Sequence, residues 1–238
     1  MTNSDLWLKA NANTPLLDAV HECNLEDVAS MSALRKLWSV DEITIAASLL
    51  DARKRAIGKL DNANSIVSDS IGVQQATSTQ IAKHKAKRFS TNEPVFDLCC
   101  GIGADLQELP AQTVGVDNNQ LRCTMANFNT GKETICKDVL LMDIPSNALI
   151  HIDPSRRNET KRLHSLDSMQ PSIESILAIT SKVHGGCIKV SPSVNLEDLE
   201  SFSVPLELEY IEERGRVVQC AIWFGSLAQN AEAVTATS

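Results

Sequence analysis

An apolar strand that runs directly into a glycine-containing turn constrains this chain more than any other feature. The segment Val95–Asp105 reads Val-Phe-Asp-Leu-Cys-Cys-Gly-Ile-Gly-Ala-Asp, so small residues follow the strand and open a helix. In a doubly wound sheet such a turn lies at the carboxyl end of the first strand, where ligands bind. Gly101 and Gly103 let the backbone approach a ligand without a Cβ, and the helix beyond them supplies unpaired N–H groups. The segment therefore predicts a ligand site.

The rest of the chain after Pro94 alternates short apolar runs with helical stretches. Such alternation predicts an α/β fold with a mostly parallel, Rossmann-like sheet and helices on both faces. Two final runs face each other across Arg214-Gly215 and predict an antiparallel terminal hairpin. The predicted strands are 95–99, 113–116, 134–136, 149–152 and 187–190, and the hairpin strands are 206–212 and 217–224.

The sequence predicts three regions. Residues 1–90 carry apolar side chains at three- and four-residue steps and form an N-terminal helical region. Residues 91–228 form the α/β domain, and 229–238 a flexible tail. No apolar run approaches a membrane span and no secretory signal precedes the helices, so we expect a cytoplasmic protein without membrane contact. Seven cysteines without a Cys-x-x-Cys pair argue against a disulfide framework and against a metal site.

The turn distinguishes between two classes of cofactor. A dinucleotide fingerprint needs a third glycine, and Leu106 occupies that position. Asp97 would also repel a pyrophosphate, whereas it would attract the cationic amino-acid end of S-adenosylmethionine. We therefore expect Asp97, Cys99, Gly101 and Gly103 to contact S-adenosylmethionine.

Acidic residues also follow the next two predicted strands. Asp117, with Asn118 beside it, ends the second strand, where a carboxylate can accept both ribose hydroxyls of a nucleoside. Asp138 follows the third strand and is placed to accept from an adenine amino group. Each acid alone could equally cap a helix or face solvent. Three acids at three successive strand ends favour the cofactor site.

These stretches resemble a known family. Asp97–Gly103, Val114–Asp117 and Ile152–Arg157 look like motifs I, II and IV of the class I S-adenosylmethionine-dependent methyltransferases. More narrowly, the chain from about Gln74 to Ala228 resembles bacterial methyltransferases with a THUMP-like domain, and more distantly the RNA cap guanine-N2 methyltransferases. Two departures stand out. Cys99 replaces a glycine that many class I enzymes have, and the 238 residues leave no room for a THUMP-like domain after the hairpin.

The segment Asp153-Pro154-Ser155 is the predicted catalytic motif. It follows the fourth strand, next to the first, so its loop can reach a transferred methyl group. A carboxylate followed by a stiff proline offers acceptors for an incoming N–H or O–H. The family pattern for base amines has a second proline and an aromatic residue, which Ser155 and Arg156 replace. We expect His151 to be buried and to point to the face of the strand opposite to Asp153.

Two basic clusters predict the substrate. Arg156 and Arg157 offer forked donors for phosphate or carboxylate, and a basic stretch before the first strand includes Lys83 and Arg88. Both clusters could also simply face solvent. In a chain of net charge −8, local clusters at one mouth favour RNA as the partner. The leading hypothesis is an RNA methyltransferase; the alternatives are a small-molecule or protein methyltransferase and a catalytically silent binding module.

Overall fold

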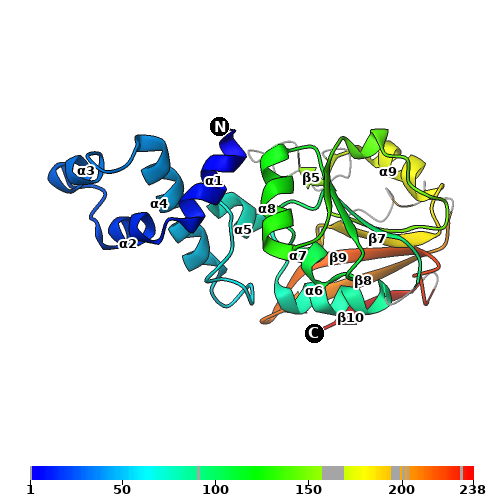
Figure 1. The fold of residues 1–238 in the computed structure, drawn as a ribbon. Coiled ribbons are helices and arrows are strands. Elements are labelled where there is room, and N and C mark those ends of the chain that lie inside the picture. Colours follow the sequence, from blue (N-terminus) through cyan, green and yellow to red (C-terminus); the bar gives the residue numbers. More distant parts are fainter. Residues whose placement is uncertain are drawn as a thin grey trace.

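The computed structural model describes residues 2–89, 92–156, 169–193, 199, 202, 204–230 and 233–238. Figure 1 shows an elongated molecule with helices α1–α4 (within residues 3–56) at one end, the sheet at the other, and α8 (Gln120–Thr130) between them. No helix in these described ranges is both long and apolar enough to cross a membrane.

Local signals define the helices of the N-terminal region. Thr2 and Ser39 form capping boxes at two of them, and Asp27 and Asp69 accept backbone N–H groups at two others. Their apolar faces form a core that also takes in Ile102 of the α/β part. The helices are α1 (Asn3–Ala12), α2 (Thr14–Glu22), α3 (Val28–Leu34), α4 (Val40–Ala56) and α5 (Ser70–Gln75).

Helix α8 fastens this region to the turn after the first strand. The Asn129 side chain accepts from the Val67 backbone N–H at 2.9 Å and donates to the carbonyls of Val67 and Ile102 at 3.1 and 3.0 Å. Arg122 makes a forked ion pair with Asp69, with its shortest N–O distance 3.0 Å. The helical region and the turn therefore share one set of contacts.

The main sheet has the strand order β10-β8-β9-β7-β4-β1-β2-β3. Among its described strands only β9 is antiparallel to its neighbours, which confirms the predicted Rossmann-like sheet with a terminal hairpin. The short β5 and β6 form a separate pair. The strands are β1 (Val95–Leu98), β2 (Val114–Asp117), β3 (Thr134–Cys136), β4 (Leu149–Ile152), β5 (Ser155–Arg156), β6 (Met169–Gln170), β7 (Gly185–Val190), β8 (Leu206–Glu213), β9 (Arg216–Gly225) and β10 (Val234–Thr237).

Helices cover both faces of the sheet. One apolar core packs Ile173 and Ile176 of α9 (Ile173–Thr180) against alternate strand residues. A second packs Ile81 of α6 (Thr79–Ala86) and Phe89 of the following turn η1 (Lys87–Phe89) against the other face. Helix α6 therefore packs on the sheet, although it lies in the sequence range predicted as a separate helical region. Helices α7 (Ala104–Glu108) and α8 (Gln120–Thr130) follow β1 and β2.

The C-terminal segment departs from its prediction as a flexible tail. Val234–Thr237 forms β10, which pairs in parallel with β8 at the edge of the sheet. Val-Thr-Ala-Thr favours a strand, because β-branched residues fit a pleated surface. The Leu208 backbone N–H donates to the Ala233 carbonyl at 3.0 Å and extends the pairing. Composition alone did not reveal this partner.

Candidate active site at the carboxyl edge of the sheet

The turn after β1 runs through the left-handed region of backbone space. Cys99 has a φ of 60°, Gly101 of 56° and Gly103 of 88°. The Cys100 N–H donates to the Val116 carbonyl at 3.0 Å and ties the turn to β2. Cys99 adopts this conformation at a cost of about 1–2 kcal/mol that glycine would avoid.

The two glycines of the turn have different roles. A Cβ on Gly101 would meet nothing within 4 Å, so this glycine faces open space. A Cβ on Gly103 would lie 2.8 Å from Thr130 and 3.1 Å from the Ala126 Cα, both on α8. Gly101 therefore fits its predicted role of leaving room for a ligand. At Gly103 the missing Cβ makes room for α8, and its predicted contact with the cofactor stays a prediction.

Asp117 is held directly beside this turn. Its Oδ2 accepts from the Gly101 N–H at 3.0 Å, and its Oδ1 accepts from the Asn119 N–H at 2.9 Å. Burial raises the pKa of the Asp117 carboxyl, and these backbone donors oppose that rise. Asn118 next to it is exposed. Each carboxylate oxygen has a second lone pair, so Asp117 can still accept hydroxyl groups.

Asp138 lies one strand further, just after β3. Its Oδ1 accepts from the Leu140 N–H at 2.9 Å and caps the short helix η2 (Val139–Leu141). The backbone of Lys137 is bonded to the Asp117 carbonyl at 2.9 Å, which keeps the two acids at the same edge. The side chain is exposed. Its contact with an adenine amino group stays a prediction.

Asp97 belongs to a buried chain of charged groups between the sheet and α6. Its Oδ1 lies 2.7 Å from His151 Nδ1, and the Lys85 Nζ lies 2.9 Å from His151 Nε2. Lys85 also lies 2.7 Å from the Asp105 Oδ1, and Thr77 donates to the other Asp105 oxygen at 2.6 Å. An ammonium can only donate, so the ring accepts at Nε2 and donates from Nδ1 to Asp97. No local sequence pattern indicates this chain of contacts.

The second oxygen of Asp97 is buried and accepts no hydrogen bond within the part of the chain that the structure describes. Burial raises the pKa of this carboxyl, although His151 opposes the rise. An orphaned buried acceptor below the turn fits a cationic donor from a ligand. The predicted contact of Asp97 with the cofactor stays a prediction.

His151 is buried, with 1% of its surface exposed, as expected, but the predicted direction of its side chain is wrong. It is the register partner of Asp97 on the neighbouring strand, and its side chain lies on the same face of the sheet as that of Asp97. Side chains two residues apart along a strand share a face, so His151 and Asp153 point the same way. His151 supports Asp97 and does not face solvent.

Asp153 forms an ion pair that the sequence did not reveal. Its Oδ2 lies 2.6 Å from the Lys189 Nζ, which also donates to the Gln75 carbonyl at 3.4 Å. Because His151 pairs with Cys187 in the register of β4 and β7, the residues two places on come side by side. Burial lowers the pKa of Lys189, but the carboxylates of Asp153 and Asp105 outweigh it, so that pKa is raised. The sequence signal that could have revealed this ion pair is that Asp153 and Lys189 each lie two residues beyond the paired strand residues His151 and Cys187.

The residues after Asp153 begin a short antiparallel pair. Pro154 is buried and Ser155 is exposed, with its Oγ 3.5 Å from the Gln170 carbonyl. Arg156 lies in β5. The predicted substrate residue Arg157 lies outside the described residues.

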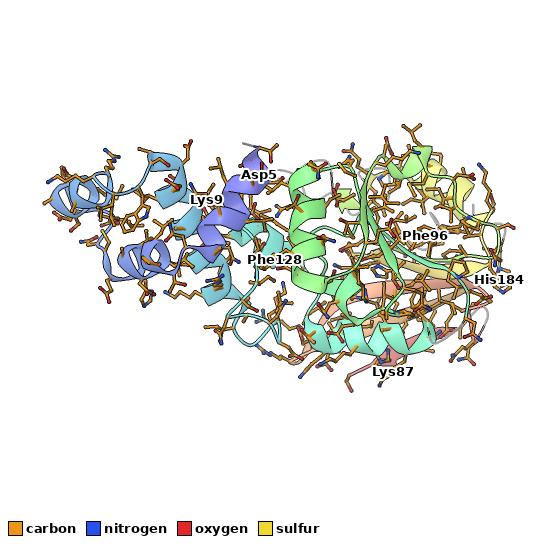
Figure 2. All side chains as sticks on the ribbon, viewed as in Figure 1. Asp5, Lys9, Lys87, Phe96, Phe128 and His184 are labelled. Carbon is orange, nitrogen blue, oxygen red and sulfur yellow. The ribbon has the colours of Figure 1, made fainter. Side chains whose placement is uncertain are left out.

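Arg88, in the basic stretch before β1, does not lie at the site as predicted. Arg88 makes a forked pair with Glu207 on β8, at 2.9 and 2.7 Å, and its guanidinium lies 4.3 Å from the centre of the Trp223 ring. These partners lie three and four strands from β1, about 14–19 Å away at ~4.8 Å per strand. Lys83 pairs with surface Asp61 at 2.6 Å. Lys87 begins η1 directly after α6; Figure 2 shows it on the outer side of these helices, and its side chain is exposed. The buried acids of the sheet attract Arg88 away from the turn.

Two curated proteins resemble the chain in sequence, and both are named as uncharacterized S-adenosylmethionine-dependent methyltransferases. They come from Mycobacterium tuberculosis strains CDC 1551 / Oshkosh and ATCC 25618 / H37Rv, and each is 31% identical over 195 residues. The matches cover 74% of this chain and 52% of the relatives. The chain therefore spans about half the length of these relatives. No protein-family model matches it.

A solved structure resembles the chain in fold. It belongs to a Porphyromonas gingivalis W83 protein whose methyltransferase assignment is itself provisional. The TM-score is 0.60 at 18% identity, and the match covers 90% of this chain and 59% of that one. At this identity the likeness establishes the fold, helical region included.

Proposed function

We propose that this chain is a class I S-adenosylmethionine-dependent methyltransferase that binds S-adenosylmethionine and transfers its methyl group; the names of its curated relatives and its resemblance in fold support the proposal. One observation carries the proposal. The Gly101 turn, Asp117 and Asp153 lie at the carboxyl ends of three neighbouring strands, β1, β2 and β4. In open α/β sheets ligands bind at this edge.

The residues present fit this cofactor. Gly101 faces open space, Asp117 keeps lone pairs for two ribose hydroxyls, and Asp97 has a buried oxygen without a partner among the described residues. Asp138 would accept from the adenine amino group. When bound, S-adenosylmethionine supplies a methyl group made electrophilic by its sulfonium. The protein's contribution is to hold the acceptor in line with that group.

Asp153 and its neighbours would hold the acceptor. The Asp153 N–H donates to the Leu98 carbonyl at 3.2 Å, so the carboxylate is fixed beside the turn. Its carboxylate and the carbonyls around Pro154 accept N–H or O–H groups, and exposed Ser155 can accept or donate. Cys99 is a poor nucleophile, because burial raises the pKa of its thiol far above its usual value. These groups suit an amine or hydroxyl acceptor.

RNA is the acceptor class we propose. Arg156 and Arg157 follow Asp153 directly, and Lys161 and Arg162 come shortly after, which places forked and single phosphate donors next to the catalytic motif in sequence. Methylation of an exocyclic amine of a base, guanine included, would match the acceptors of Asp153. A cytoplasmic location goes with this proposal.

A small-molecule or protein acceptor is the second candidate, and one observation favours it. Of the basic residues before β1, Lys85 is buried, while Arg88 and Lys83 are paired with carboxylates. Only a reduced positive surface is left there to attract a polyanion, and the whole chain has a net charge of −8.

The decisive experiment measures transfer of labelled methyl groups from S-adenosylmethionine into total RNA from cells that lack this protein. Label in RNA supports the proposal, and label only in protein or small molecules supports the second candidate. Calorimetric binding of S-adenosylmethionine without any transfer identifies a catalytically silent module. RNA binding across a salt series separates the acceptor classes independently, because phosphate contacts give a steep salt dependence.

A further inference from the structure

The ion pair between Lys189 and Asp153 joins β7 to the end of β4, and it is the basis for a role of Lys189 beyond cofactor binding. We propose that Lys189 is a positioning residue that fixes the Asp153 carboxylate so that one oxygen is left to accept an N–H from an amine acceptor. The inference rests on the proposed methyltransferase function. It identifies a residue and narrows the acceptor class, because a carbon nucleophile without an N–H would gain nothing from that oxygen.

Lys189 is held where it cannot easily leave Asp153. Only 15% of its side chain is exposed, and the 2.6 Å contact with Asp153 is supplemented by the Gln75 carbonyl at 3.4 Å. The negative charge of Asp105 acts on it as well. A largely buried ammonium needs such partners, because moving it away from them leaves an uncompensated charge. The pair is therefore a fixed part of the wall at the carboxyl edge.

Asp153 is constrained from its backbone too. Its N–H is bonded to the Leu98 carbonyl of β1, and buried Pro154 follows it. Lys189 occupies Oδ2, while Oδ1 accepts no hydrogen bond from any described residue. Since 32% of the Asp153 side chain is exposed, a donor from solvent or substrate can reach it. Among the described residues, one oxygen is thus committed to Lys189 and the other remains open to a donor.

The different roles of the two Asp153 oxygens explain why Asp153 needs a charged partner. Without Lys189 the carboxylate could rotate and present either oxygen, so the acceptor nitrogen would be less well aligned. Loss of alignment acts on the rate of transfer more than on substrate binding, because in-line geometry is needed only at the reacting atoms. Lys189 would touch Asp153 and not the acceptor, so it acts through Asp153.

The test compares Lys189→Met, Lys189→Arg and Asp153→Asn with wild type and with exposed Lys87→Met as the matched control. RNA from cells that lack the protein is the acceptor. We expect Lys189→Met to lower kcat about tenfold or more, with KM and the calorimetric Kd for S-adenosylmethionine within about twofold. Lys189→Arg should restore most of the rate, and Lys87→Met should match wild type. Lys189→Met combined with Asp153→Asn should be no slower than Asp153→Asn alone.

An NMR titration of the Lys189 amine supplies a readout that does not depend on activity. Its pKa should fall in Asp153→Asn, since burial remains while a neighbouring carboxylate is lost. An unchanged titration, a normal kcat in folded Lys189→Met, or rate losses that multiply in the double variant would each overturn the positioning role. Label in 5-methylpyrimidines in place of N-methylated bases would overturn the amine assignment. A wild-type protein that transfers no methyl group overturns the proposed function as well.

Discussion

The Lys85 ammonium lies 2.7 Å from the Asp105 carboxylate, and the two side chains are 1% and 9% exposed. Burial alone would raise the pKa of Asp105, but Lys85, His151 and Lys189 outweigh it and hold that pKa well below its usual range. The pair joins α6 to α7 directly below the turn that begins the candidate site. Charged residues that stabilise the fold therefore lie directly beside the turn of the candidate site.

Asp105→Asn should lower the free energy of unfolding at pH 7 by about 3–5 kcal/mol, because it leaves Lys85 buried without a counter-charge. The lowered pKa means that Asp105 contributes stability above pH ~4, and that this contribution is lost as pH falls through the folded-state pKa. Urea unfolding between pH 3 and pH 7 should thus show a shallower loss with acid in the variant. Lys83→Met, which breaks an exposed pair, is the control and should change little. Equal stability of Asp105→Asn and wild type would disprove this account.

Asp117→Ala should weaken S-adenosylmethionine binding at least tenfold. Two ribose hydroxyls would lose a charged acceptor, and each such bond contributes about 1.5–3 kcal/mol. Calorimetry gives the affinity, and a melting curve verifies the fold, because the Gly101 N–H also loses its partner. Asp143→Ala removes the same charge at an exposed position and should bind normally. Unchanged affinity in folded Asp117→Ala would remove Asp117 from the site.

Gly101→Ala and Gly103→Ala should fail in different ways. Alanine at Gly101 bears only the cost of a left-handed φ, about 1–2 kcal/mol, yet it places a methyl group in the open space of the turn. Its cofactor affinity should fall more than its stability. Alanine at Gly103 adds a collision with Thr130, worth about 1–3 kcal/mol more. Denaturant unfolding and calorimetry on both variants measure the contrast, and identical profiles would contradict it.

Arg156→Ala should raise KM for RNA and flatten the salt dependence of binding, with kcat nearly kept, because a phosphate contact holds substrate and does not align it. Asp153→Ala should show the opposite pattern, a large fall in kcat with little change in cofactor affinity. Steady-state kinetics at several salt concentrations distinguish the two. If Asp153→Ala loses cofactor binding and rate in parallel, Asp153 belongs to the cofactor site and Ser155 becomes the positioning candidate.

The sequence was most informative where local pattern decides the structure. Strands at 134–136 and 149–152 were predicted with the bounds that β3 and β4 have, because polar turns flank short apolar runs. The Gly101 turn and Asp117 were placed at one edge because parallel strands align their carboxyl ends. These features depend on neighbours in the chain or on a general rule of sheet topology.

Contacts between distant residues were the part that local pattern could not supply. Lys85 lies within the basic stretch before the first strand, yet its side chain faces the sheet and is buried. Arg88 was assigned to the site, and Glu207, which is 119 residues away in sequence, holds it elsewhere. Predicting either partner requires the register of β8 and the position of α6, which no short window contains. The same applies to Lys189 and Asp153.

The hydrogen bonds of the Asn129 side chain to Val67 and Ile102 have a thermodynamic consequence. One amide satisfies backbone groups on both Val67 and Ile102, so the helical region cannot separate from the turn without exposing unpaired donors and acceptors. Opening of the turn and opening of the 66–75 segment then belong to one cooperative unit. Any ligand that stabilises the turn would slow amide hydrogen exchange in α5, although α5 lies before the α/β domain in the chain.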